Sequence, residues 1–167
     1  MARILVADDE PGLREFVADV VDLAEDGRGV ARLDGKVVFI ADALPGEQVR
    51  FRYVRVSRDV DEGQTVGVDR ASPDRVSPRC AHFGVCGGCA LQHLSPEAQV
   101  RYKHKQLIEA LARIGKVAPV QVAEPLTGPV WGYRRRARLG AKYVGKRDTV
   151  LVGFRERESS FLAALES

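Results

Sequence analysis

The chain lacks any apolar run that approaches the roughly 20 residues needed to cross a membrane. Residues 1–10 have neither the basic start nor the long apolar stretch of a secretory signal, so we expect a cytoplasmic protein with no membrane partner. Cysteine is scarce: the three among 167 residues are an odd number, which argues against a closed disulfide framework. The overall composition and the absence of a long apolar run exclude collagen-like, mucin-like and transmembrane proteins. A content of 45% hydrophobic and 29% charged residues suits one soluble domain or two small ones.

Negative charge is sparse in the second half of the chain. Residues 1–78 carry 11 Lys and Arg against 16 Asp and Glu, a net charge of −5. Residues 79–167 carry 15 against 7, a net charge of +8, and 131–157 alone hold nine basic and two acidic residues. A basic half indicates a polyanionic partner, most often nucleic acid; the alternative is a basic surface that only keeps the chain solvated.

Short strand candidates separated by turns fill much of the first half. They are Val30–Leu33, Val37–Ile40, Val49–Tyr53 and Thr65–Val68, with turns at Asp26-Gly27, Asp34-Gly35 and Pro45-Gly46. The alternation that begins at Val49 slips at Val54–Val56, which indicates a bulge. Such a series predicts a small closed barrel, a fold that often binds oligonucleotides. Arg50, Arg52 and Arg55 are candidates for phosphate contacts, or else simply keep the outer face soluble.

The first residues contain a short apolar run, Ile4–Ala7, which ends at the acidic pair Asp8 and Asp9, and apolar residues over Leu13–Val21 have helical spacing. This strand, acidic pair and amphipathic stretch resemble the opening of a response-regulator receiver domain. In receiver domains such an acidic pair holds a divalent cation, so a signalling protein is one alternative function. The later Asp, Ser or Thr, and Lys of a receiver have no counterpart here, and we interpret the resemblance as a chance match or residues 1–15 as a leader.

A helix and a second β section are predicted in the basic half. Ser95 suits the N-cap, Pro96 the first helical position, and Gly115 the C-cap. One apolar face would contain Val100, Leu107, Ile108, Leu111 and Ile114. Two strands, Arg138–Val144 and Val150–Phe154, would flank a turn.

Aromatic and basic residues gather beside this second β section and are candidates for RNA binding. They are Trp131, Tyr133, Arg134, Arg135, Arg136, Arg138 and Lys142. Together they would combine base stacking with phosphate contacts. Core packing is the alternative role for the two aromatic rings.

The three cysteines are the strongest chemical signal in the chain. Cys80, Cys86 and Cys89 lie within ten residues, with Gly84, Gly87 and Gly88 between them. Three thiols at this spacing are typical of metal ligands. An iron–sulfur cluster would take a fourth cysteine from elsewhere, whereas zinc could accept His93 to give a Cys3His site.

Several motifs, in order along the chain, resemble a known family. Residues 23–32, 35–39 and 44–47 are similar to a TRAM domain, an RNA-binding barrel. The run from Cys80 to Leu94 and the stretch Trp131–Arg134 resemble the N-terminal part of the bacterial 23S ribosomal RNA uracil-C5 methyltransferases. The resemblance implies a [4Fe-4S] cluster on Cys80, Cys86 and Cys89, ribosomal RNA as the partner, and S-adenosylmethionine as the methyl donor of the full-length enzyme. It also implies that His93 occupies a motif position without being a ligand.

The chain departs from the family pattern in places that matter. The family's fourth cluster cysteine follows a strand like Phe161–Ala163, and Ser167 is about where it is expected. Arg136 stands where Lys is common, and the two are not interchangeable at a geometric site. In the family's reaction a cysteine thiolate adds to C6 of uracil, and C5 then attacks the methyl group of the cofactor. This chain has no further cysteine for that step and no Gly-x-Gly-x-Gly turn for the cofactor.

The expected fold class is therefore mainly β with one prominent helix. We expect a leader at 1–15, an OB-like TRAM barrel at 16–76, an iron–sulfur cysteine segment with its helix at 77–115, and a basic β section at 116–167. The last section would begin an incomplete RNA-binding and methyltransferase region. We expect a monomer without catalytic residues of its own, whose cluster is labile because one ligand is missing. A zinc-binding RNA module is the alternative beside the signalling protein.

Overall fold

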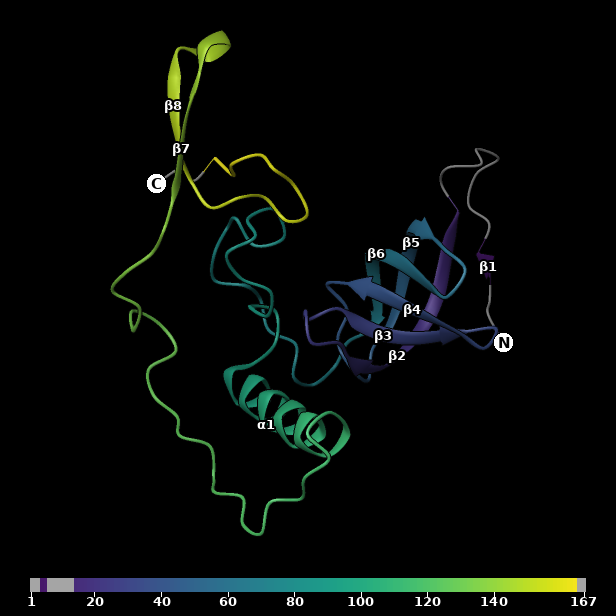
Figure 1. The fold of residues 1–167 in the computed structure, drawn as a ribbon. Helices are drawn as coiled ribbons and strands as arrows, with labels where there is room; N and C mark the ends of the chain where they lie inside the picture. Colours follow the sequence, from purple (N-terminus) through teal and green to yellow (C-terminus); the bar gives the residue numbers. More distant parts are fainter. Residues whose placement is uncertain (1–3, 6–13, 165–167) are drawn as a thin grey trace. The chain divides into compact units, whose positions relative to one another are not determined.

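The computed structural model describes residues 4–5 and 14–164, with the backbone alone for residues 4–5 and Arg147. The described chain is mainly β with one α-helix, which confirms the predicted fold class (Figure 1). It divides into two compact units, residues 1–75 and 76–167, and each is treated by itself below. No helix in the described ranges is long and apolar enough to cross a membrane.

Five strands of the first unit close into a barrel. They are β2 (Glu15–Leu23), β3 (Gly29–Leu33), β4 (Lys36–Ala41), β5 (Gln48–Val56) and β6 (Val60–Arg70). Their order is β2-β3-β4-β6-β5, and β5 pairs back with β2. The β4–β6 pair is parallel and the other pairs are antiparallel. This is the closed OB-like barrel that the short strands predicted, and closure leaves these strands few unpaired edges.

The barrel interior follows from period-2 alternation along the strands. Val38 and Ile40 on β4, and Val49 and Phe51 on β5, are completely buried, while the residues between them are partly exposed. The turn between β3 and β4 has positive φ angles at both central residues, 49° at Asp34 and 82° at Gly35. That geometry matches the twist of two antiparallel strands and explains the Asp-Gly pair.

The slip in the β5 pattern is a real irregularity of the sheet. The register between β5 and β6 shifts between Tyr53 and Arg55, as the sequence predicted. Beyond this point Val54, Arg55 and Val56 are all exposed. The bulge therefore ends the alternation between buried and exposed residues before the strand itself ends.

The helical spacing that supports the receiver-like resemblance does not give a helix in the described residues. Residues Glu15–Leu23 form β2, and β1 (Ile4–Leu5) pairs antiparallel with its start. The first half of β2 pairs with β5 and its second half with β3, so tertiary pairing overrides the helical spacing of its apolar residues. The acidic pair Asp8 and Asp9 lies outside the described residues.

The second unit contains α1 (Pro96–Arg113) and a hairpin. The Ser95 side chain accepts a hydrogen bond from the Ala98 N–H (3.3 Å), as an N-cap should. The predicted C-cap at Gly115 is off by one residue, because Ile114 is the C-cap and Lys116 adopts the left-handed conformation at φ 53°. Strands β7 (Gly140–Val144) and β8 (Thr149–Gly153) pair across a short 3-10 turn, η1 (Gly145–Arg147), as predicted.

The predicted apolar face of α1 is only partly covered. Val100, Ile108 and Leu111 are half-buried, but Leu107 is 57% exposed and Ile114 is 78% exposed. Between α1 and β7, residues 114–139 contain no helix or strand. The part of the predicted basic β section that forms regular strands is thus confined to 140–153.

Candidate nucleic-acid interface and cysteine loop

The cysteines lie on an irregular loop, residues 80–89, which we call the cysteine loop. Local hydrogen bonds shape it: the Phe83 N–H donates to the Cys80 carbonyl (3.1 Å), and the Cys86 N–H donates to that of His82 (2.9 Å). The Gly88 N–H donates to Cys86 Sγ at 3.4 Å. A glycine between the cysteines thus presents its N–H group to a cysteine sulfur.

A segment distant in the sequence, residues 154–163, pairs with the cysteine loop. We call it the brace segment. The Gly87 N–H donates to the Arg155 carbonyl (2.8 Å), and the Arg157 N–H donates to the Val85 carbonyl (2.9 Å). A Cβ at position 87 would lie 2.9 Å from the Arg155 carbonyl oxygen, so close pairing requires glycine there. The brace segment folds back on itself, since the Ala163 N–H donates to the Phe154 carbonyl (2.9 Å).

The thiols of the cysteine loop are of a kind that binds metals. In the described chain, their side chains are not close enough together to share one metal ion. All three thiols are free of disulfides, with Cys80 and Cys86 half-buried and Cys89 exposed. Within the residues that the structure describes, no three His, Cys, Asp or Glu side chains lie close enough together to hold a metal ion. The loop would have to close around a metal or cluster to bring its thiolates together.

His93, the alternative zinc ligand, is buried at 1% exposure. Its ring lies 5.2 Å from the ring of Phe83, and its carbonyl accepts a hydrogen bond from the Val76 N–H (2.9 Å). These contacts give the histidine a packing role beneath the cysteine loop.

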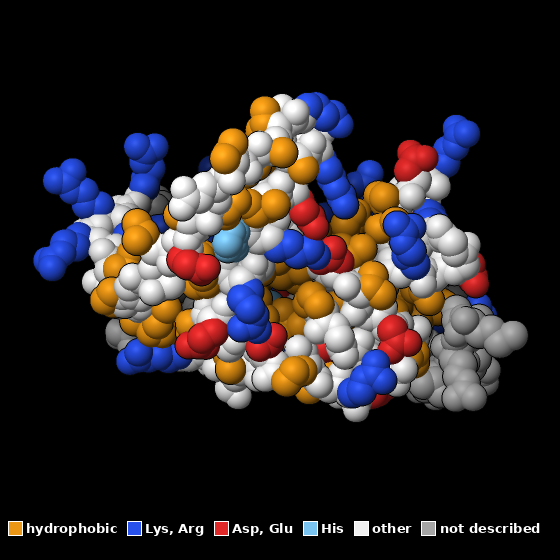
Figure 2. Space-filling model, turned by 90° about the horizontal axis from the view of Figure 1, so that it is seen from below, with side chains coloured by type: hydrophobic (Ala, Val, Ile, Leu, Met, Phe, Trp, Pro, Cys, Tyr) orange, Lys and Arg blue, Asp and Glu red, His pale blue; other side chains and the backbone are white. Residues whose placement is uncertain are grey.

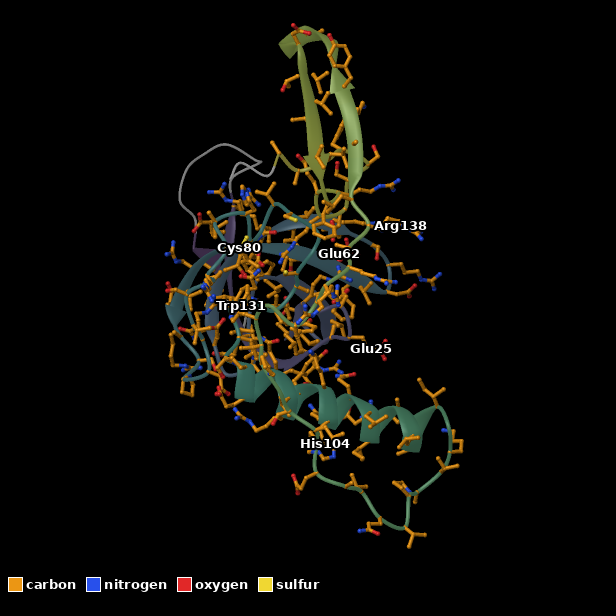
Figure 3. All side chains as sticks on the ribbon, turned by 90° about the vertical axis from the view of Figure 1, so that its left-hand side faces the viewer. Glu25, Glu62, Cys80, His104, Trp131 and Arg138 are labelled. Carbon is orange, nitrogen blue, oxygen red and sulfur yellow. The ribbon has the colours of Figure 1, made fainter. Side chains whose placement is uncertain are left out.

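The basic and aromatic candidates of the second unit lie on its surface. Trp131 is 48% exposed and Tyr133 is 64% exposed, so neither ring packs in a core. The Arg79 guanidinium lies 5.1 Å from the Trp131 ring centre, and Arg134 lies 5.8 Å from that of Tyr133. Arg135, Arg136, Arg138 and Lys142 are exposed too. Figure 3 labels Trp131, and it shows Arg138 on the stretch that leads to β7.

Basic, apolar and several acidic side chains are exposed together on the face of the molecule seen in Figure 2. In Figure 2, Lys and Arg side chains project outward with hydrophobic side chains exposed between them. The basic and apolar side chains suit a partner with a charged backbone and flat bases, because each of these two kinds then has a matching contact.

The three arginine candidates on the barrel differ in their surroundings. Arg50 pairs with Asp69 (2.9 Å) and with Glu15 (3.2 Å), and Arg52 pairs with Glu15 (2.9 Å). The hydrogen bond to Asp69 and the charge of that carboxylate raise the pKa of Arg50. Arg55 is exposed and has no ion pair within the described part of the chain. The structure therefore separates two arginines held by carboxylates from one that faces solvent.

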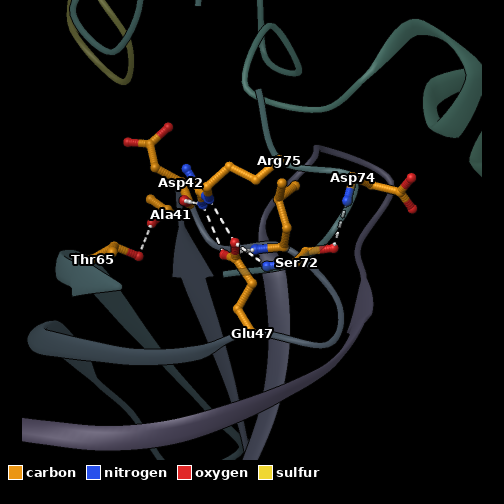
Figure 4. Close-up of polar contacts among 8 residues, drawn as sticks. Ala41, Asp42, Glu47, Thr65, Ser72, Asp74 and Arg75 are labelled. Atoms are coloured by element: carbon orange, nitrogen blue, oxygen red, sulfur yellow. Dashed lines mark hydrogen bonds and ion pairs between the residues drawn. The ribbon is translucent and has the colours of Figure 1, made fainter. Parts of the chain in front are cut away.

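Sequence reasoning missed a buried ion pair in the barrel unit. Glu47, which is completely buried, binds the guanidinium of Arg75 through both carboxylate oxygens (2.5 and 2.8 Å). The N–H groups of Leu44 (2.8 Å) and Ser72 (3.1 Å) donate to the same carboxylate (Figure 4). A Glu directly after the turn Pro45-Gly46 was visible in the sequence, but its partner lies 28 residues away.

Comparison with known proteins agrees with this geometry. Residues 14–66 match the model of the TRAM domain. The chain is 52% identical over 150 residues to "23S rRNA (uracil(1939)-C(5))-methyltransferase RlmD" of Alcanivorax borkumensis, covering 90% of this chain and 34% of that protein. It is 54% identical over 153 residues to the protein of the same name from Xanthomonas axonopodis pv. citri, with the same coverages. The chain thus spans about a third of the length of the curated relatives it matches.

Proposed function

We propose that this chain, which belongs to the 23S rRNA uracil-C5 methyltransferase family and matches its N-terminal third, binds ribosomal RNA and holds a [4Fe-4S] cluster. Methyl transfer from S-adenosylmethionine to uracil would require residues that this sequence does not contain. The residues of this chain would contribute recognition of the RNA. Since its substrate would be ribosomal RNA, we place its action in the cytoplasm.

One observation carries the RNA-binding proposal. The stretch 131–139 is exposed at every residue and contains two aromatic rings and four arginines. Unpaired bases of folded RNA stack on such rings, and arginines contact the neighbouring phosphates. Because the stretch lacks helix and strand, it can follow an irregular RNA surface. The TRAM barrel supports the proposal as a second RNA-binding element, with Arg55 as its most accessible candidate cation.

The cluster proposal rests on the cysteine loop and the brace segment. Cys80, Cys86 and Cys89 supply three thiolates, and a bound cluster would contribute iron–sulfur chemistry there. Residues 161–163 lie beside Phe154, whose ring would be 3.1 Å from a Cβ placed on Gly88. The sequence motif that precedes the family's fourth cysteine is therefore held one strand away from the cysteine loop.

The RNA proposal is tested by measuring affinity for a 23S ribosomal RNA transcript as a function of salt. For the 167-residue chain, we expect affinity to fall steeply between roughly 50 and 200 mM salt because phosphate contacts release counterions. The variant R134Q/R135Q/R136Q should bind about tenfold or more weakly, with a salt slope reduced by about 2 to 3.

The matched control removes the same three charges from α1, as R101Q/K103Q/R113Q. These three residues are exposed on the helix. We expect the control to lower affinity slightly through net charge and to leave the slope nearly unchanged. Equal losses in both triple variants would mean that net charge alone attracts RNA, which contradicts a site at 131–139.

The cluster proposal is tested on protein purified without oxygen. Broad visible absorption together with iron and sulfide is expected, and C80S, C86S and C89S should each abolish it. Colour should fade in air, because three thiolates leave one cluster position open. One equivalent of zinc without colour would instead establish the Cys3His module, and H93Q would then release the zinc.

A further inference from the structure

We propose that Arg157 is a positioning residue that holds the cysteine loop in shape for its metal centre. It contacts the loop at Phe83, Val85 and Cys89, although it lies 68 residues beyond Cys89. That the metal centre is a cluster rests on the proposed function. That Arg157 orders the loop follows from its contacts and does not depend on the cluster.

Three contacts tie Arg157 to the loop. Its guanidinium Nη2 donates to the Cys89 carbonyl at 3.1 Å. The same guanidinium lies 4.7 Å from the ring centre of Phe83, which sits between Cys80 and Cys86. Its backbone N–H donates to the carbonyl of Val85, the residue before Cys86 (2.9 Å). One side chain and one peptide group therefore contact the loop at three positions, two in its middle and one at its end.

These contacts add to the few that join the loop to the rest of the described chain. The others include the bridge between Cys86 and Glu156, the hydrogen bond from the Cys80 N–H to the Gln92 side chain (3.1 Å) and the contact of the Phe83 and His93 rings. Three thiols on a mobile loop would each lose conformational freedom on binding a metal, and that cost lowers affinity. A planar guanidinium that stacks on a ring and donates to a carbonyl restricts the motion of the loop before a metal binds. Residues in such supporting positions typically change metal affinity 10- to 100-fold when mutated.

Arg155 provides a matched control two residues away. Its side chain is exposed, and it contributes to the loop through its backbone carbonyl, which a substitution retains. R155Q and R157Q remove the same charge from the same segment. R157K keeps the charge of Arg157 but loses the planar fork and its stacking geometry.

The experiment combines two readouts on the full 167-residue chain. The first is hydrogen exchange of the metal-free protein, followed in peptides that cover residues 80–92. R157Q should exchange there about tenfold faster than the parent chain, R155Q should match the parent, and R157K should lie between them. The second readout is the rate at which a chelator removes iron from the reconstituted protein, which R157Q should raise about tenfold.

Exchange in α1 and in the β7–β8 hairpin serves as the check on folding. If R157Q loses the protection of α1 and of the hairpin, loop exchange is compared between R157K and R155Q instead. Faster exchange in R157K then supports the role of Arg157. Equal exchange of the loop in the Arg157 and Arg155 variants would overturn the proposal. A parent chain that takes up no iron or sulfide would refute the cluster, yet the exchange measurement on metal-free protein would still decide the role of Arg157.

Discussion

The guanidinium of Arg75 binds both carboxylate oxygens of Glu47, a residue that water does not reach. Burial of the Glu47 carboxyl raises its pKa, but hydrogen bonds from Arg75, Ser72 and Leu44, with the charge of Arg75, outweigh this and leave the pKa lowered. The pair joins the turn before β5 to the chain that leaves the barrel after β6. It therefore fixes where the polypeptide exits the barrel unit.

Breaking this pair should destabilise the barrel strongly. We expect E47Q to lower the free energy of unfolding by about 3 kcal/mol, since the variant leaves a partly buried Arg75 without its counter-ion. R70Q is the control, because Arg70 pairs with Asp19 at the surface, where both side chains are more than 60% exposed. That change should cost less than about 1 kcal/mol. Urea unfolding followed by circular dichroism measures the free energy of unfolding of both variants. Equal losses would contradict a special contribution of the buried Glu47–Arg75 pair.

The same pair predicts a pH dependence of stability. A carboxyl whose pKa is lower in the folded state stabilises the protein fully above its unfolded pKa, and that contribution is lost as the pH falls through the folded value. The stability difference between the parent chain and E47Q should therefore be largest near neutral pH and shrink below about pH 4. A difference that stays constant across this range would show that the carboxylate charge is not what stabilises the fold.

Gly63 on β6 should not tolerate even a methyl group. A Cβ there would lie 2.4 Å from the ring of Phe51, which is completely buried. We expect G63A to cost about 1 to 3 kcal/mol, because the close-packed barrel has no room to move the ring. G128A is the control, since a Cβ at position 128 meets nothing within 4 Å. Pairing G63A with F51L should cost less than the sum of the single changes, and simple additivity would argue against this contact.

The barrel arginines should differ in their contribution to RNA binding. R55Q should weaken binding of a 23S ribosomal RNA transcript about threefold and reduce the salt slope by about 1, as expected for a lost phosphate contact. R50Q removes the same charge, but Arg50 is already held by Asp69 and Glu15 in the protein, so its slope should stay near that of the parent. A larger slope change in R50Q than in R55Q would reverse this ranking.

Local sequence signals predicted the secondary structure well wherever the chemistry was local. The Asp34-Gly35 turn, the bulge near Val54 and the Ser95 cap all appear as expected, because each depends on backbone preferences within a few residues. The helical spacing of the apolar residues before Leu23 did not give a helix, for the opposite reason. Pairing with β3 and β5 makes Glu15–Leu23 a strand.

The sequence by itself determined the residue types and their spacing: the three thiols, the basic and aromatic stretch at 131–139, and the short strands of a TRAM barrel. Only the tertiary structure decided which of these groups meet. It pairs Arg50 and Arg52 with carboxylates while Arg55 faces solvent, and it brings Arg75 to Glu47 and Arg157 to the cysteine loop. The physical reason is that these contacts join residues far apart along the chain, so they depend on the register of the closed barrel and the fold of the brace segment. Neither is encoded in any one local stretch of residues.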